Sequence, residues 1–342
     1  MPSPRILIVR LSAIGDVLHA VPTACALRRQ FPDAFLGWVV EGRTGELLKG
    51  HPALDEVIVV PRGWLKSAKT VWNLRKQLRA LRFDTTLDLQ GLSKSAIAAW
   101  LSGAKQRISY GGADARELSP WLNNELVVPE SEHVVTRALE MLRPLGIVEP
   151  EVEFNLPRVA AAEEAADRMI AAAGIISGSF AVVNPGAGWP SKLWPAERFG
   201  AVARHLGRQH GLPGLVVWAG AQEKKWAETI VACSGGQARL APPTSLVELA
   251  AILRRARMFV GSDTGPLHLA AAVGTPSVGL FGPVSEKRNG PYGLQNVTVQ
   301  KMLLRGRSRE RRQAGPESML AIRIDDVTAA CDRLLSRHAV AA

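Results

Sequence analysis

The residues with the clearest chemical potential lie in one stretch, residues 258–276, where an apolar run leads into a polar turn and an Ala-rich segment. Pro266, which a helix tolerates in its first turn, predicts strand, turn and helix in that order. The turn supplies a carboxylate, a hydroxyl, a glycine and an imidazole: Asp263, Thr264, Gly265 and His268. Because free N–H groups and the helix dipole attract anions, we expect a phosphate site here; a capped helix with a satisfied histidine is the plainer alternative.

A second turn, residues 184–188 (Asn-Pro-Gly-Ala-Gly), follows another apolar run and contains Gly186 and Ala187, with Lys192 shortly after. Small residues let a phosphate approach the backbone, and a lysine adds a point charge. The spacing matches neither of the common phosphate-loop motifs, so the signal is weak alone. Glu223 lies in a further turn after a strand, where a carboxylate could hold ribose hydroxyls, although a surface Glu is the default.

Asp16 occupies the turn between the first strand and the first helix. A helix cap is the commoner role for Asp there, and a general base facing a second domain is the alternative. His19, one helical turn along, could compete as a base, but packing or solvation is the plainer expectation. The sequence contains no Asp-x-Asp motif and suggests no two-carboxylate metal site, so we expect neither a metal nor another cofactor.

Length and composition limit the classes of protein to which this chain can belong. A chain of 342 residues, 47% of them apolar, is expected to form two domains. The net charge of +11 suggests an acidic partner, but no recognisable nucleic-acid module is present. Cys25, Cys233 and Cys331 fit no metal or disulfide pattern and indicate a reducing compartment. The sequence contains no uncharged apolar run of about 18 residues that would predict a membrane span.

Apolar strands alternate with helical segments in both halves of the chain, which predicts two doubly wound, Rossmann-like α/β domains facing across a cleft. Strands are expected at residues 5–11, 34–40, 57–60, 85–89, 107–110, 180–184, 214–219, 258–260 and 277–281. Helices are expected at residues 17–30, 70–81, 93–101, 133–145, 159–173, 196–210, 224–233, 246–256 and 325–337. A Pro-flanked linker, residues 150–157, places the domains at 1–157 and 158–324, with residues 325–342 as a C-terminal helix and tail.

Two stretches rich in cations remain. The segment 301–315 carries five arginines between Arg305 and Arg312 without clear periodicity, and we expect an exposed, mobile loop. Arg62, Lys66 and Lys69 follow the third strand, while Lys94 and Arg116 lie near other strand ends. These five could bind an anionic substrate; a solvated basic surface is nearly as good an interpretation for Lys66 and Lys69.

Four motifs in this order resemble glycosyltransferase family nine, the lipopolysaccharide heptosyltransferases, over nearly the whole chain. They are residues 6–19 (ILIVRLSAIGDVLH), 88–95 (DLQGLSKS), 192–195 (KLWP) and 262–268 (SDTGPLH), with Phe-Gly-Pro at 281–283. Residues 112–117 resemble the type I enzyme, which adds the first heptose to the inner core. The basic run 305–312 stands where some members carry a cysteine-rich loop, which puts the identity of the acceptor in doubt more than the reaction.

The resemblance implies a GT-B fold, an ADP-heptose donor, a Kdo–lipid A acceptor and inversion at the anomeric carbon. The family's base falls on Asp16. Its positions for the sugar donor fall on Gly186, Ala187, Lys192, Glu223, Asp263, Thr264, Gly265 and His268. We expect Arg62, Lys66, Lys94 and Arg116 to face an anionic, lipid-linked acceptor. The enzyme is then expected in the cytoplasm, peripheral to the inner face of the cytoplasmic membrane, without nucleic acid.

Three other interpretations stay open at this point. The chain could use another sugar nucleotide or acceptor within the same family. It could be a nucleotide-sugar epimerase on the same fold; ADP release that requires an acceptor would separate transfer from epimerisation. It could also be a non-catalytic anion-binding protein, which would leave Asp16 and Lys192 unexplained.

Overall fold

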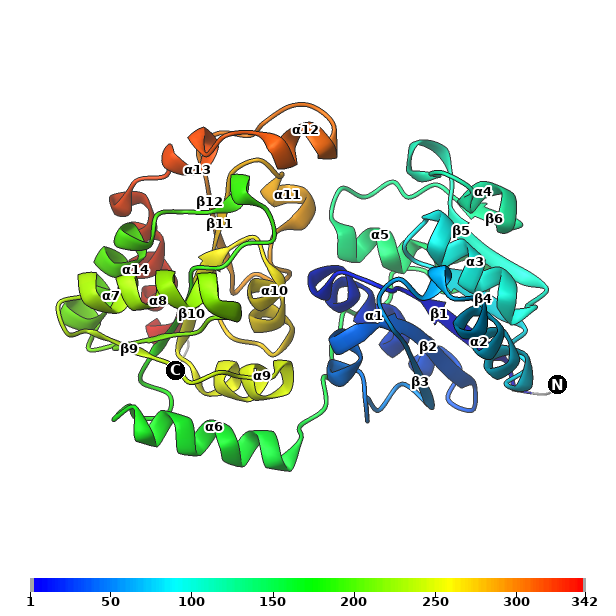
Figure 1. The fold of residues 1–342 in the computed structure, drawn as a ribbon, viewed down its shortest axis with the longest axis horizontal. Helices are drawn as coiled ribbons and strands as arrows, with labels where there is room; N and C mark the ends of the chain where they lie inside the picture. The colour runs from blue at the N-terminus through cyan, green and yellow to red at the C-terminus, as the bar shows by residue number, and fades with distance from the viewer. Residues whose placement is uncertain (1–2, 341–342) are drawn as a thin grey trace. The chain divides into compact units, whose positions relative to one another are not determined.

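The computed structural model describes the backbone of residues 3–340 and the side chains of residues 3–337. The chain divides after Pro157 into two compact units, here called unit 1 and unit 2 (Figure 1). Each unit has its own sheet and its own hydrophobic core, so each is described by itself.

Unit 1 is built on a six-stranded sheet in the order β3-β2-β1-β4-β5-β6, with every neighbouring pair parallel. The strands are β1 (Arg5–Val9), β2 (Phe35–Glu41), β3 (Glu56–Val60), β4 (Thr85–Asp88), β5 (Gln106–Tyr110) and β6 (Glu125–Val127). The two central strands, β1 and β4, are almost entirely buried, as expected of a sheet covered on both faces. This strand order is that of the doubly wound dinucleotide-binding fold.

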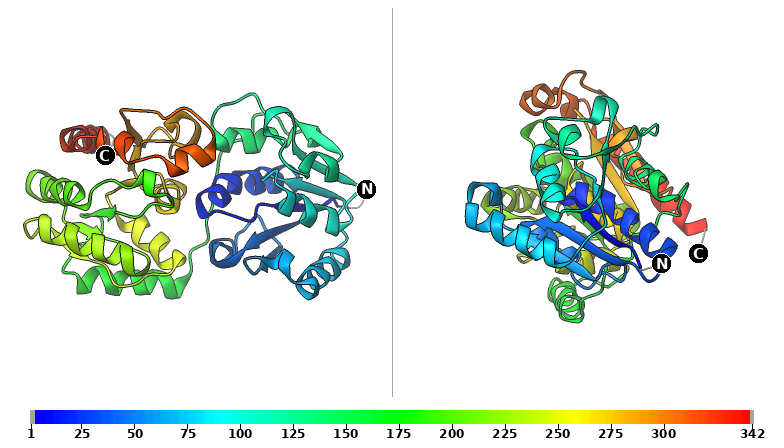
Figure 2. Two further views of the ribbon diagram at one scale, coloured as in Figure 1. Left: turned by 45° about the horizontal axis from the view of Figure 1, so that its top comes forward. Right: turned by 90° about the vertical axis from the view of Figure 1, so that its right-hand side faces the viewer.

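Helices cover both faces of this sheet (Figures 1 and 2). On one face α1 packs against α5, and on the other α3 packs against α2 and α4. Their bounds are α1 (Ile14–Gln30), α2 (Ala68–Ala80), α3 (Ser93–Ser102), α4 (Ser119–Leu122) and α5 (Val134–Glu140), with 3₁₀ turns at Gly42–Leu47, Trp64–Lys66, Gly112–Asp114 and Arg143–Leu145. Leu7 and Val9 of β1 enter a core with Leu74 and Leu78 of α2, which fixes that helix on the sheet.

Unit 2 repeats the arrangement: its sheet has the order β9-β8-β7-β10-β11-β12, again parallel throughout. The strands are β7 (Ala181–Asn184), β8 (Gly214–Val216), β9 (Ala238–Leu240), β10 (Met258–Ser262), β11 (Ser277–Phe281) and β12 (Val297–Gln300). The first strand of the unit, β7, lies beside the fourth, β10, as β1 lies beside β4 in unit 1. The sequence prediction of two doubly wound α/β folds is confirmed in both sheets.

Unit 2 also has helices on both faces. The helix α7 packs against α8 and α14 on one face, and α9 packs against α6 and α10 on the other. The helices are α6 (Ala160–Ala172), α7 (Ala196–His210), α8 (Gly220–Cys233), α9 (Leu246–Arg255), α10 (Gly265–Ala272), α11 (Glu286–Asn289), α12 (Ser308–Gln313), α13 (Glu317–Leu320) and α14 (Ile324–Val340), with a 3₁₀ turn at Pro190–Lys192. The C-terminal helix α14 also contacts β11 and β12 and so completes this unit.

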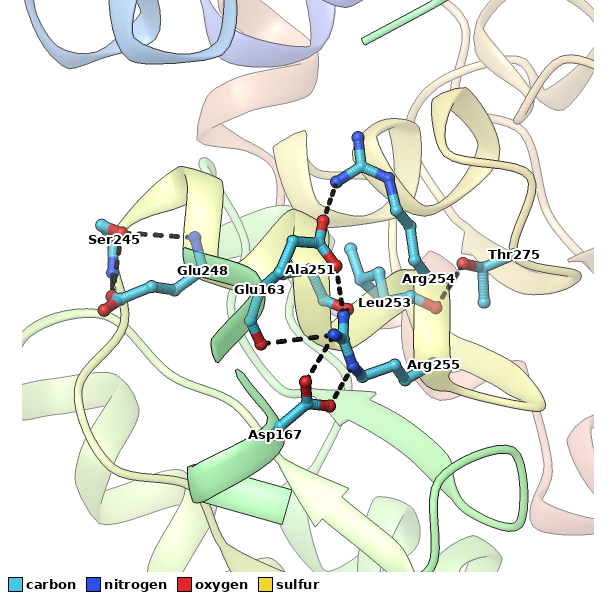
Figure 3. A network of polar contacts seen from close by, with 9 residues as sticks. All are labelled: Glu163, Asp167, Ser245, Glu248, Ala251, Leu253, Arg254, Arg255 and Thr275. Atoms are coloured by element: carbon cyan, nitrogen blue, oxygen red, sulfur yellow. Dashed lines mark hydrogen bonds and ion pairs between the residues drawn. The ribbon is translucent and has the colours of Figure 1, made fainter. Parts of the chain in front are cut away.

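An ion-pair network fastens α6, the first helix of unit 2, to α9 (Figure 3). The Glu163 carboxylate accepts hydrogen bonds from Arg254 and Arg255, and Asp167 binds Arg255 through both of its oxygens. Such a two-pronged arginine–carboxylate pair has a defined geometry as well as charge. The network therefore fixes the chain segment that follows Pro157 on its own unit.

Two predicted helix boundaries were wrong, and each has a local reason. The first helix begins at Ile14, three residues earlier than expected, so that Asp16 lies in its first turn. The helix predicted to end at residue 145 ends at Glu140 and is followed by a 3₁₀ turn. Pro144, in that turn, lacks the N–H that would continue the α-helical pattern.

Unit 2 differs from the expected elements at two places that matter for the site. The turn predicted around Glu223 is the first turn of α8, which begins at Gly220. The segment 301–315, predicted as a loop, contains the helix α12. The sequence also failed to predict the strands β6, β9 and β12, because each has only three or four residues and lacks a continuous apolar run.

Candidate functional site

The carboxyl ends of β7 and β10 are where unit 2 is expected to bind a ligand. In a doubly wound sheet, ligands bind outside the carboxyl ends of the strands at the point where the strand order reverses. In unit 2 that point lies between β7 and β10. The turn 185–192 follows β7, and Asp263 and Thr264 follow β10, so the fold places two of the sequence motifs at one edge of the sheet.

Asp263 lies at the centre of a buried polar cluster. Lys192 Nζ donates a hydrogen bond to Asp263 Oδ2 at 2.5 Å, and His268 Nε2 lies 3.0 Å from Asp263 Oδ1. The lysine side chain is 12% exposed, and the other two are 5% exposed. One carboxylate therefore fixes both the Lys192 ammonium, which comes from a 3₁₀ turn, and the His268 imidazole, which comes from the end of the first turn of α10.

The charges in this cluster compensate for its burial. Burial alone would raise the pKa of Asp263, but the hydrogen bond with His268 and the charge of Lys192 outweigh it and lower the pKa below its usual value. Asp263 is thus ionised at neutral pH. An ammonium group has three N–H donors, and within the described part of the chain Lys192 donates a hydrogen bond to Asp263, so the lysine keeps donors for a further anion.

An aromatic ring and a second cation stand beside Lys192. Its Nζ lies 4.4 Å from the centre of the Trp189 ring, and the guanidinium carbon of Arg312 lies 4.9 Å from the same centre. Ser191 donates a hydrogen bond of 2.8 Å to the Arg311 carbonyl, which holds α12 on the turn before Lys192. Sequence reasoning missed Trp189 and Arg312, although a Trp three residues before a candidate Lys was a usable signal.

The start of α10 carries unpartnered polar atoms. Thr264 precedes the helix with extended backbone, and Pro266 stands in its first turn, as predicted. The hydroxyls of Thr264 and Ser262 and the amide oxygen of Asn184 are buried without a hydrogen-bond partner in the described part of the chain. A buried polar atom without a partner lowers the stability of the fold by about 1–3 kcal/mol. Three such atoms at the carboxyl ends of β7 and β10 therefore indicate a place for a polar ligand.

Glu223 lies against the glycine-rich turn. A Cβ atom on Gly186 would stand 2.5 Å from the Glu223 carboxyl carbon, so only glycine leaves room for that side chain. The carboxylate accepts a hydrogen bond of 2.8 Å from the Ala219 backbone N–H. Burial raises the pKa of Glu223, and that hydrogen bond opposes the rise. The structure thus brings together Glu223 and the turn that contains Gly186 and Ala187.

The matching edge of unit 1 holds Asp16. Its Oδ2 accepts a hydrogen bond of 3.0 Å from the Ala13 backbone N–H, and its Oδ1 lies 2.9 Å from Arg10 Nη2. Asp16 therefore does help to cap the start of α1, although the N-cap residue itself is Ala13. The side chain is still 41% exposed, so the carboxylate is held in place and accessible to a substrate. Arg10 was missed as its partner; a lone Arg closing an apolar strand was the available signal.

His19 is buried, and its ring packs edge-on against His133, with 6.3 Å between the ring centres. The packing interpretation of His19 is therefore confirmed. It does not share the accessible position of Asp16.

Asp88, at the end of β4, holds the neighbouring loop in shape. It is fully buried and accepts hydrogen bonds from the backbone N–H groups of Gln90 and Gly91. Burial raises its pKa, and those hydrogen bonds and others from hydroxyls oppose the rise. Gln90 in turn accepts a hydrogen bond from the Leu11 N–H, so the motif after β4 positions the motif after β1.

The predicted acceptor cations have different surroundings. Lys94 pairs with Glu41 at 2.9 Å and donates to the Ser12 hydroxyl at 3.2 Å, so its charge is partly compensated by a partner that the sequence did not reveal. Arg62, Lys66 and Arg116 are exposed on or beside 3₁₀ turns. The described helices include none long and apolar enough to cross a membrane.

Comparisons with known proteins match this chain to one family. The model of glycosyltransferase family 9 (heptosyltransferase) matches residues 71–317. The lipopolysaccharide heptosyltransferase 1 of Pseudomonas aeruginosa is 30% identical over 305 residues, 86% of this chain and 82% of that protein.

Solved structures agree with the sequence comparison. The E. coli heptosyltransferase WaaC, solved with ADP, has a TM-score of 0.78 at 25% identity and covers 96% of this chain and 99% of its own. A family 9 glycosyl transferase from Veillonella parvula has a TM-score of 0.87 at 21% identity, with 98% of each chain covered. The fold is accordingly GT-B-like, and transfer, not epimerisation or passive anion binding, is the class of activity. This chain belongs to glycosyltransferase family 9 and is a heptosyltransferase of the lipopolysaccharide core.

Proposed function

We propose that this enzyme transfers heptose from ADP-heptose to the first heptose position on Kdo–lipid A, with inversion at the anomeric carbon. The observation that carries the proposal is the buried Lys192–Asp263–His268 cluster at the start of α10, beside unpartnered hydroxyls. This is a cation fixed next to free helical N–H groups, the combination that stabilises a diphosphate.

The nucleotide is assigned to unit 2. The diphosphate lies at the N–H groups of Thr264 and Gly265 and at the remaining N–H donors of Lys192. The unpartnered Thr264 hydroxyl gives one further contact. Glu223, against the Gly186 turn, accepts hydrogen bonds from the ribose. The ADP in the similar E. coli structure supports an adenine nucleotide.

The base is assigned to Asp16 of unit 1. The acceptor hydroxyl oxygen attacks the anomeric carbon and its proton passes to the carboxylate, while the bond from that carbon to the diphosphate breaks and ADP leaves with the electron pair. Attack on the face opposite the leaving group inverts the carbon. Arg10 and the Ala13 N–H aim the carboxylate, and exposure of its side chain leaves room for the hydroxyl. The leaving charge is stabilised by Lys192.

The acceptor is assigned to the cations of unit 1. Kdo carries a carboxylate and lipid A carries phosphates, which suits the exposed Arg62, Lys66 and Arg116. Lys94, held by Glu41 and Ser12, is positioned to contribute through its third N–H donor. Similarity to a type 1 enzyme favours the first heptose position.

The experiment is an ADP-release assay with ADP-heptose and one of two acceptors, Kdo–lipid A or the same molecule already carrying one heptose. We expect ADP release with the first acceptor only, and a product whose anomeric configuration is opposite to that of the donor. Release only with the heptosylated acceptor would assign a later step. Release without an acceptor would contradict transfer.

A further inference from the structure

The helices α2, α3 and α4 form one outer side of unit 1 and carry an unusual surface. They lie next to one another on the sheet, with α3 between the other two (Figures 1 and 2). Each presents a tryptophan to the solvent: Trp72 is 64% exposed, Trp100 is 49% exposed and Trp121 is 84% exposed. The large hydrophobic residues that are exposed in the described part of unit 2 include no aromatic side chain.

The segments that contain α2 and α3 carry positive charge only. Residues 61–82, which include α2, carry no Asp or Glu and seven cations: Arg62, Lys66, Lys69, Arg75, Lys76, Arg79 and Arg82. Residues 93–105, which include α3, carry two lysines and again no acid. Near α4 the charge is mixed: Asp114 pairs with Arg137, whereas the exposed Glu117 accepts a hydrogen bond from the Ser93 N–H and keeps its negative charge.

The helix α2 shows how these groups are combined. Leu74 and Leu78 are buried in the core of unit 1, which fixes the inner face of the helix. Trp72 and Lys76, four residues apart, therefore share the outer face, with Lys69 one turn before Trp72. A helix with cations around an exposed tryptophan is typical of segments that lie on an anionic bilayer.

Exposed apolar side chains continue this surface beyond α2. Leu118 is exposed beside α4, and Leu126 and Val128 are exposed at the edge strand β6. Large apolar groups exposed together on a folded unit mark a place of contact with another surface. Tryptophan is the side chain most suited to the level of lipid headgroups, because its ring is apolar and its N–H polar.

We propose that the α2–α3–α4 side of unit 1 docks on an anionic phospholipid bilayer, with Trp72 and Trp121 entering the headgroup layer and the cations of residues 61–82 binding lipid phosphates. The inference rests on the proposed function, since a lipid-linked acceptor is met at a bilayer surface. Docking by this side holds the acceptor cations Arg62 and Lys66 at the membrane, because they belong to the same segment as α2.

The test is flotation of the full chain with vesicles that contain neither acceptor nor sugar donor. Vesicles of phosphatidylcholine alone are compared with vesicles in which about a third of the lipid is phosphatidylglycerol. We expect binding to the second kind only, and weaker binding as the salt concentration rises. Absence of binding to the anionic vesicles would overturn the proposal.

Two variants and matched controls locate the surface. Arg75→Glu with Lys76→Glu is expected to weaken binding at least about tenfold, because each surface cation contributes roughly fivefold. Trp72→Ala with Trp121→Ala is expected to weaken it several-fold. The controls, Arg204→Glu with Arg208→Glu and Leu294→Ala, change exposed residues of unit 2 and should bind as the unchanged chain does.

Two further measurements separate the possible outcomes. All variants should keep the thermal midpoint of the unchanged chain and its turnover of a short, lipid-free Kdo acceptor. Vesicle binding that the α2 and α4 variants leave unchanged would overturn the proposal. A dimer in solution that the tryptophan variant converts to a monomer would also overturn it, because the surface would then be a subunit interface. Since these vesicles hold no substrate, failure here leaves the ADP-release assay to judge the proposed function.

Discussion

The two units share one strand order but differ in the polar side chains at the carboxyl ends of their strands, where ligands are expected. In unit 2 the polar groups are buried and bound to one another: Asp263 fixes Lys192 and His268. In unit 1 the carboxylate of Asp16 is held by Arg10 but remains two-fifths exposed, and most of the neighbouring cations are on the surface. A small ligand of fixed shape suits the first site, and a large anionic substrate suits the second.

The difference also concerns stability. The Lys192–Asp263 pair is buried, and removing one partner of such a pair leaves an uncompensated charge. The exposed cations of unit 1 have no comparable role in the fold. Substitutions of these exposed cations should therefore report on function alone, whereas those in the unit 2 cluster need a check on folding.

The largest effect is expected from Asp16→Asn. The amide keeps the size of the side chain but cannot take the acceptor proton, and general base catalysis contributes 10²–10⁴-fold. We expect kcat to fall by about that factor while ADP affinity and the thermal midpoint stay near those of the unchanged enzyme. His19→Ala, next to it on α1, should cost much less kcat. If Asp16→Asn kept most of its turnover, Asp16 would serve only to hold the start of α1 and would not be the base.

The next largest effect is expected from Lys192→Ala. Loss of a hydrogen bond to a charged group costs about 1.5–3 kcal/mol, which corresponds to roughly 10- to 150-fold weaker binding of ADP-heptose. Titration calorimetry gives the affinity, and a thermal melt checks folding, because Asp263 loses its partner. The acceptor KM should not change. An unchanged affinity for the sugar donor in a folded variant would remove Lys192 from the site.

A smaller effect is expected from Gly186→Ala. Its new Cβ would meet the Glu223 carboxyl group, the mobile end of a side chain, so Glu223 must move while the fold is kept. Loss of its hydrogen bonds to ribose is worth about 0.5–1.5 kcal/mol, or a few-fold in affinity for the sugar donor. Gly188→Ala is the matched control in the same turn, because nothing lies within 4 Å of its added Cβ. Equal effects of the two substitutions would argue against a role for Glu223.

The smallest effect is expected from reversing the exposed cations Arg62 and Lys66 to Glu. Exposed charge pairs contribute about 0.2–1 kcal/mol each, so the acceptor KM should rise several-fold and the KM for ADP-heptose should stay the same. The difference from the unchanged enzyme should shrink at high salt, since screening acts over about 8 Å at physiological ionic strength. If both KM values rose together, these cations would not be specific to the acceptor.

The sequence predicted more of the fold than of the contacts within the site. Apolar strands and amphipathic helices appear in local patterns, and so does the turn that holds Asp263. Asp16 was expected in a turn but lies in the first turn of α1. The short edge strands β6, β9 and β12 were missed because edge strands form where neighbours allow, without a strong pattern of their own.

The partners of the site residues could not be predicted from the sequence. Lys192 meets Asp263 across 71 residues, and Lys94 meets Glu41 across 53. Only the parallel order of the strands brings such residues together. The start of α1 was misplaced because Ile14 and Gly15 are poor helix-start signals, whereas the backbone is held there by the hydrogen bond from Ala13 to Asp16.

The central claim is that unit 2 binds the nucleotide, whereas unit 1 binds the acceptor and supplies the base. Backbone hydrogen exchange of the whole chain, measured with and without ADP, tests this claim most directly. A ligand slows exchange where it holds the backbone. We expect slower exchange in residues 185–192 and 263–268 of unit 2, and unchanged exchange in residues 10–18 and 88–94 of unit 1. Protection of the unit 1 turns, with none at the start of α10, would contradict the account.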